Sequence, residues 1–136
     1  TGIQLEAGSQ ASDFEFLPTD VNLARCQRYF NRPINGNSQG ICTAGAYNSS
    51  DAFGIYIFPI KMRTTPSIET TSGSSYYKFI GNNTGTSFDG PLVLSTGTES
   101  SAQIAFSSFS GALTQGVAGA FRTNNASSSV AFSAEL

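Results

Sequence analysis

The sequence predicts an all-β fold, a jelly-roll-like antiparallel β-sandwich with one short N-terminal helix. Many short apolar runs are separated by Gly, Ser and Asn, a pattern typical of sandwiches and barrels. Aromatic residues form 12% of the 136 residues, which supplies enough apolar area to offset the entropy lost on ordering the chain. Charged residues also form only 12%, so much of the surface is neutral, as in a subunit of an oligomer. The length fits one domain.

Two regions of different character divide the chain. Residues 1–18 are polar and irregular apart from two short alternating pieces, Ile3 to Glu6 and Phe14 to Phe16. We interpret residues 1–18 as a lead-in segment from a preceding shaft or domain, and residues 19–136 as a C-terminal β-sandwich domain.

A single helix is predicted over residues 20–27. Thr19 or Asp20 suits the N-cap, because its side-chain oxygen can accept a hydrogen bond from the first turn. Apolar and long side chains then follow at helical spacing, at Val21, Leu23, Ala24 and Gln27.

Eight or nine short strands are predicted after the helix, over residues 29–32, 41–47, 53–62, 67–71, 76–80, 91–94, 102–106, 116–122 and 129–134. Residues 53–62 form the longest and most apolar of them, and both of its faces are apolar in the middle. Such a strand is central in its sheet or lies at a subunit contact. Pro59 cannot donate a ladder hydrogen bond and predicts a bulge or an edge.

Composition excludes several classes of activity. The absence of histidine removes the usual general base and most zinc sites. The net charge of −2 and the lack of a basic cluster argue against nucleic-acid binding, and no apolar run is long enough for membrane insertion. The acids are scattered, so a two-carboxylate glycosidase is a distant alternative. Asp51 and Asp89 lie in oxygen-rich loops but lack calcium-ligand spacing. We therefore expect that the chain is not an enzyme and that it binds neither a metal ion nor a cofactor.

Sugar binding is the sharper possibility. It requires an exposed aromatic ring and polar partners for the hydroxyl groups. A short span supplies these residue types, at Tyr76, Tyr77, Lys78, Asn82, Asn83 and Asp89. Tyr47, beside Asn48 and Asp51, is a second candidate. The alternative is that the tyrosines belong to the core, because neighbouring side chains of a strand point to opposite faces.

The segment from Leu23 to Phe30 joins the two regions. Its arginines, Arg25 and Arg28, with nearby Arg32, are expected to pair with acids of the lead-in or of a neighbouring subunit. We predict structural roles for Arg25, Cys26, Arg28, Tyr29 and Pro59. Cys26 and Cys42 are interpreted as buried thiols of a chain made in a reducing cytosol, and their pairing is left open.

The junction also resembles one found in bacteriophage tail fibres and other virion structural proteins. There a segment of the type Leu-Glu-x-Gly-Ser-x-Ala-Thr-x-Phe-Glu precedes Leu-Ala-x-Cys-Gln-Arg-Tyr-Tyr. This chain has Leu5-Glu6-Ala7-Gly8-Ser9, then Leu23-Ala24-Arg25-Cys26-Gln27-Arg28-Tyr29-Phe30. Phe58 to Pro66 and the terminal Ala134-Glu135-Leu136 agree as well, whereas Val21-Asn22 replaces a usual acidic pair.

This resemblance implies a C-terminal domain of a tail fibre or tailspike, exposed on the virion after assembly in the host cytoplasm. It implies a homotrimer that contacts other virion tail proteins and attaches to the host by binding a bacterial surface polysaccharide. The alternative is a purely structural module, for trimerisation and capping or for virion decoration, without a ligand. No catalytic residue follows from the resemblance.

Overall fold

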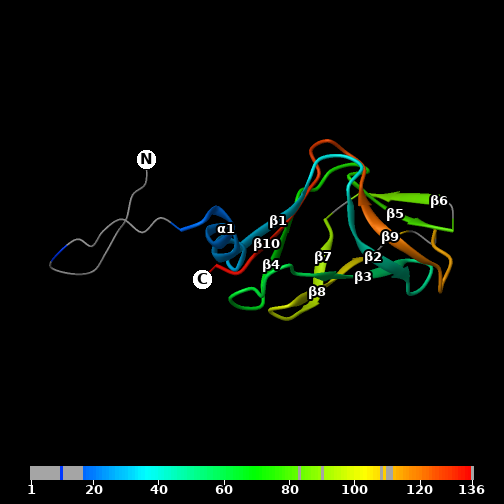
Figure 1. Ribbon diagram of the computed structural model, residues 1–136. Coiled ribbons are helices and arrows are strands. Elements are labelled where there is room, and N and C mark those ends of the chain that lie inside the picture. The colour runs from blue at the N-terminus through cyan, green and yellow to red at the C-terminus, as the bar shows by residue number, and fades with distance from the viewer. Residues whose placement is uncertain are drawn as a thin grey trace.

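The computed structural model describes residues 10, 17–82, 84–89, 91–107, 109 and 112–135. This part of the chain contains one short helix and ten strands, and the strands form two antiparallel sheets (Figure 1). The prediction of an all-β, sandwich-like fold with one short helix is therefore confirmed. The predicted lead-in lies outside the described residues apart from Gln10, Leu17 and Pro18.

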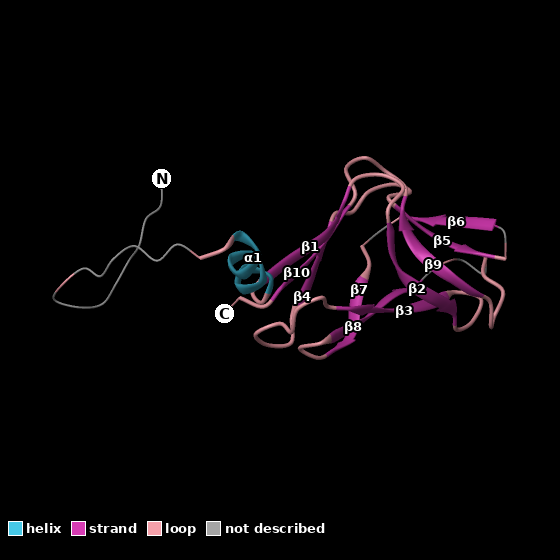
Figure 2. Ribbon diagram, viewed as in Figure 1, coloured by secondary structure: helices cyan, strands magenta, loops and turns pink. Residues whose placement is uncertain are grey.

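The smaller sheet has three strands in the order β1-β10-β4. They are β1 (Phe30–Asn35), β10 (Ser129–Ser133) and β4 (Ser67–Thr70). The helix α1 (Thr19–Gln27) leads directly into β1, and the C-terminal end of the chain lies beside it (Figure 2). This sheet therefore joins both ends of the described domain.

The larger sheet has seven strands in the order β6-β5-β9-β2-β3-β8-β7. They are β2 (Gly40–Ala46), β3 (Asp51–Ile57), β5 (Tyr77–Gly81), β6 (Thr84–Phe88), β7 (Val93–Gly97), β8 (Ser101–Ser107) and β9 (Ala118–Thr123). All of the paired neighbours run antiparallel.

Strong curling gives the larger sheet a concave inner face. Phe88 of β6 stacks on Phe106 of β8 with ring centroids 3.8 Å apart, although four strands separate β6 from β8 in the sheet. The concave face encloses a cluster of buried aromatic side chains, at Tyr77, Phe79, Phe88, Phe106, Phe109 and Phe121. Their burial is the main contribution of this sheet to the core.

The two sheets meet at a second aromatic cluster. The ring centroid of Phe132 in β10 lies 4.9 Å from that of Tyr56 in β3 and 4.9 Å from that of Phe58, which follows β3. Burial raises the pKa of Tyr56, more than the adjacent Asn31 side chain lowers it. Asn31 is itself buried in β1, and its Nδ2 atom has no hydrogen-bond partner.

Three predictions about individual elements are corrected. The helix is confirmed, but Pro18 rather than Thr19 or Asp20 occupies the N-cap. The predicted strand over 53–62 ends at Ile57, and Pro59 is exposed in a bend beyond it, so it forms neither a bulge nor an edge. Sequence analysis missed β6, because Gly85-Thr86-Ser87 reads as a loop.

Candidate functional site

The predicted sugar site includes a tyrosine that belongs to the core. Tyr77 is fully buried, and its hydroxyl lies 2.7 Å from the carbonyl oxygen of Thr71 and 2.9 Å from that of Ser129. Burial raises its pKa, more than the nearby hydrogen bonds lower it. Its ring cannot stack on a sugar, so the ligand-binding role predicted for Tyr77 is wrong.

The neighbouring tyrosine is partly used in packing as well. The ring of Tyr76 is half-buried and covers Gly73 so closely that a Cβ there would collide with it. The Tyr76 carbonyl accepts a hydrogen bond from the Ser128 hydroxyl at 2.7 Å. Asn82 is exposed with a φ of +50° in the turn between β5 and β6, and Asn83 lies outside the described residues.

Asp89 follows β6, at the end of the β5–β6 hairpin opposite to the turn that contains Asn82. Its carboxylate accepts a hydrogen bond from the backbone of Ser75 and borders a hollow of about 450 Å³. The hollow is lined by Ser75, Thr86, Ser87, Phe88, Asp89, Phe106, Phe109 and Ala112, and Lys78 does not line it. The predicted ligand residues are therefore not gathered at one place.

Tyr47 is the most accessible of the predicted aromatic residues. Its side chain is 67% exposed and meets Phe53 edge-on, with ring centroids 5.7 Å apart. Its expected polar partners, Asn48 and Asp51, form hydrogen bonds within a turn instead. The Asn48 amide donates to the Asp51 carboxylate at 2.6 Å, and this bond is the first cause of the lowered pKa of Asp51.

The arginine-containing junction is exposed. Arg25, Cys26 and Arg28 are all accessible to solvent, so the prediction of a buried thiol at Cys26 is wrong. Arg63 lies over the ring of Tyr29, 5.6 Å from its centroid. Neither Arg25 nor Arg28 lies within 4.0 Å of a carboxylate of the described residues.

The outer, convex face of the larger sheet is the largest feature that the sequence analysis only partly foresaw. Cross-strand register places two uncharged rows on it. One row is Val93, Ala105, Phe53, Gly45 and Ala118, and the next is Thr96, Gln103, Ile55, Thr43, Ala120, Ile80 and Gly85. Ile57 extends this face beyond the second row. We call these residues the outer face.

Large apolar side chains project from the outer face. Ile55 and Val93 are about half exposed, and Ile57 is 74% exposed. Two hollows share Ile55 and Gln103 as lining residues, with volumes of about 290 and 120 Å³. The face therefore combines projecting apolar side chains with hollows, and this shape is suited to a closely packed interface.

Two cations lie opposite each other at one end of the outer face. Lys78 of β5 pairs in register with Arg122 of β9, and Ser87 of β6 lies opposite Lys78 on the other side. Arg122 Nε donates to the carbonyl of Ser38 at 3.0 Å. Like charges placed directly opposite each other repel. An anion bound between Lys78 and Arg122 would relieve this repulsion. Lys78 was predicted and Arg122 was missed.

Groupings with ligand chemistry are otherwise sparse in the part of the chain that the structure covers. No three acidic, cysteine or histidine side chains there come together as a metal-ion site would require. The described residues include no helix that is long and apolar enough to cross a membrane. No family model, no curated protein and no solved structure matches this chain.

Proposed function

We propose that this chain is the C-terminal domain of a virion tail fibre or tailspike, and that its outer face joins copies of it into a homotrimer. The observation that carries the proposal is the outer face, where Val93 and Ile55 project from rows without a charge and Ile57 projects just beyond them. Leaving three such side chains in water is unfavourable, and burying each one contributes up to about 1.5–3 kcal/mol. The virion context rests on the sequence resemblance.

Shape supports self-association as well. The hollows beside Ile55 have volumes of about 290 and 120 Å³, and exposed Ile57 lies nearby on the same strand. An apolar side chain of a neighbouring copy would fill such a hollow without burying a charge. The jelly-roll connection of the strands and the number of three subunits stay predictions.

The test is the mass of the particle in solution. Sedimentation of the wild-type chain at micromolar concentration should give a trimer, and Ile57→Asp should weaken the assembly by at least about 100-fold, because a carboxylate would be buried without a partner. Ser72→Asp is the matched control, since Ser72 is exposed in the loop after β4. A stable, folded wild-type monomer would refute the proposal.

A second candidate function is host attachment through an anionic surface polysaccharide. The observation that favours it is the Lys78–Arg122 pair, which the strand register places beside the hydroxyl-bearing Ser87. Guanidinium and ammonium groups suit the carboxylates or phosphates of acidic glycans. Virion attachment by this pair would place the ligand on β5 and β9, and not on the Tyr76–Tyr77 side chains.

Glycan binding is tested with a panel of acidic and neutral bacterial polysaccharides. Binding to acidic members should be saturable and should fall about tenfold in Lys78→Ala, as expected for the loss of one charge-assisted contact. Lys61→Ala removes an equal charge elsewhere and should change nothing. If no polysaccharide binds while the assembly is intact, the purely structural role is the correct one.

A further inference from the structure

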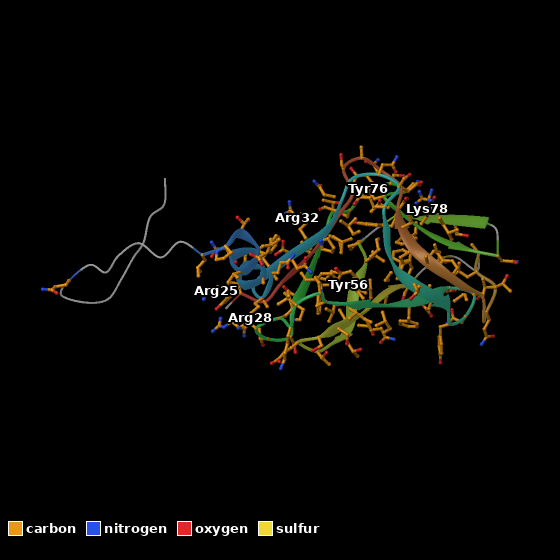
Figure 3. All side chains as sticks on the ribbon, viewed as in Figure 1. Arg25, Arg28, Arg32, Tyr56, Tyr76 and Lys78 are labelled. Carbon is orange, nitrogen blue, oxygen red and sulfur yellow. The ribbon has the colours of Figure 1, made fainter. Side chains whose placement is uncertain are left out.

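Most of the basic residues gather at the end of the domain that carries α1. Arg25, Arg28, Arg32 and Arg63 account for four of the seven Lys and Arg residues. The backbone of Arg63 donates to the carbonyl of Arg28 at 2.7 Å, and Arg25 precedes Arg28 by one helical turn. Figure 3 shows Arg25, Arg28 and Arg32 around α1 and the start of β1. We call these four residues the arginine-rich end.

No arginine of this end forms an ion pair within the described chain, although Asp20 lies on α1 and Ala134, the residue before Glu135, donates to the carbonyl of Tyr29. The one ion pair among the described residues joins Lys61 to Glu99 at 2.7 Å. Arg32 and Arg63 instead lie over the rings of Phe30 and Tyr29, at 5.5 and 5.6 Å from the centroids. Such stacking leaves the N–H groups at the guanidinium edge free to donate to both oxygens of a carboxylate.

The helix itself requires an additional contact. α1 has nine residues and none of them is buried, and Leu23 is 55% exposed. Isolated helices shorter than about 12–15 residues are marginal in water, since packing of one face supplies most helical stability. Val21 and Leu23 therefore lack an apolar cover among the described residues.

The lead-in segment has the complementary composition. Residues 1–18 contain Glu6, Asp13 and Glu15 and no basic residue, so they carry a charge of −3 from their side chains. They also contain apolar Ile3, Leu5, Phe14 and Phe16. Because the segment is covalently joined to α1, its effective concentration at the arginine-rich end is high.

We propose that the lead-in segment docks on the arginine-rich end of its own chain, with Asp13 and Glu15 pairing with Arg25 and Arg28. Alternate residues of an extended segment share one face, so both carboxylates can meet the guanidinium groups together. The segment is long enough for this contact. The six residues from Asp13 to Thr19 span up to about 20 Å when extended, whereas the nine residues of the helix span about 13.5 Å. The docked segment also covers Val21 and Leu23.

Hydrogen exchange of the lead-in amides tests the docking in the full chain. In the wild type at low salt, residues 10–17 should exchange about tenfold more slowly than an unstructured peptide, as two partly exposed ion pairs would produce. R25E/R28E and D13K/E15K should each abolish this protection. The combined four-residue exchange of charge should restore it, which simple loss of folding would not do.

Two controls isolate the proposed contact. Lys78→Glu reverses a charge at the far end of the larger sheet and should leave the protection unchanged. Exchange in β8 reports on folding and should be equal in the wild type and in the charge-reversal variants. Ile57→Asp should retain the protection even as a monomer, because the segment and its site belong to one chain. Any of three results would overturn the proposal. The lead-in amides of the wild type could exchange at the rate of an unstructured peptide, the charge reversals could leave the protection unchanged, or the monomer could lose the protection.

Discussion

At the scale of single residues, the two thiols have very different surroundings. Cys26 is exposed on α1, whereas Cys42 of β2 is packed against the concave core, and burial raises its pKa to about 12. The folded state therefore favours the neutral Cys42 thiol. Its contribution to stability is complete below the ordinary pKa of 9.0 and declines as the pH rises from there toward 12.

We predict that thiol reagents distinguish these cysteines. At pH 8 only about 10⁻⁴ of Cys42 is thiolate, so a native chain should react with one equivalent of a maleimide or disulfide reagent, at Cys26. Two equivalents should react after denaturation, and Cys26→Ser should leave the native chain unreactive. Rapid reaction of two thiols in the native protein would contradict the burial of Cys42.

Gly119 of β9 is a second residue whose role is specific. A Cβ at this position would fall 2.7 Å from the Phe79 ring and would also press against the carbonyl of Ile80. Gly119→Ala should therefore lower the free energy of unfolding by about 1–3 kcal/mol through overpacking. Gly40→Ala is the matched control, because no atom lies within 4 Å of the added methyl group. Urea denaturation measures both, and equal stabilities would contradict the close approach.

At the scale of elements, alternation and turn chemistry predicted most strands because these signals are local. The helix over 20–27 and the strands around Ile41, Ser67, Ala102 and Ser129 were found in this way. The failures have physical causes: β6 has small polar residues on its solvent-facing side, and an apolar run continued past Ile57 although Phe58 turns into the second aromatic cluster.

The candidate sites were harder to predict, because they depend on contacts between distant strands. Alternation did place Ile55 and Ile57 on one face of their strand. Arg122 has no local signal that links it to Lys78, since the pairing of β5 with β9 brings them together across 44 residues. Tyr77 and Tyr76 were known to point to opposite sides, but only the sheet register shows which of them is buried.

The turn between β2 and β3 allows a prediction for one hairpin. Asn48 Oδ1 accepts hydrogen bonds from the backbone of Ser50 at 2.6 Å and of Asp51 at 2.7 Å. Asn48→Ala should lower the free energy of unfolding by about 1 kcal/mol, as is usual for turn hydrogen bonds. Thermal denaturation at neutral pH measures this change, and an unchanged midpoint would show that the turn needs no side chain.

The same turn has a pH dependence of known sign. The Asn48 side chain lowers the pKa of Asp51 in the folded state below its ordinary 3.8. The stabilisation is therefore present above that ordinary value and is lost as the pH falls through the lower folded pKa. Asn48→Ala should remove part of this acid dependence, so the difference in midpoint between the two proteins should narrow at pH 2–3.

At the scale of the whole molecule, the uncharged rows and the arginine-rich end occupy different parts of the surface. The outer face lies on the larger sheet and carries rows without a charge, whereas the arginine-rich end surrounds α1 beside the smaller sheet (Figure 1). An apolar contact is insensitive to ionic strength, but contacts between exposed charges are screened beyond about 3 Å in 1 M salt. Salt should therefore separate the two proposed contacts.

The last prediction uses this difference in one experiment. Raising NaCl from 20 mM to 1 M should leave the sedimenting mass unchanged and should release the lead-in, seen as faster amide exchange in residues 10–17. The melting temperature should also rise with protein concentration, because association stabilises the folded chain, and Ile57→Asp should abolish that rise. A mass that falls with salt would place charged contacts in the subunit interface, against the uncharged rows of the outer face.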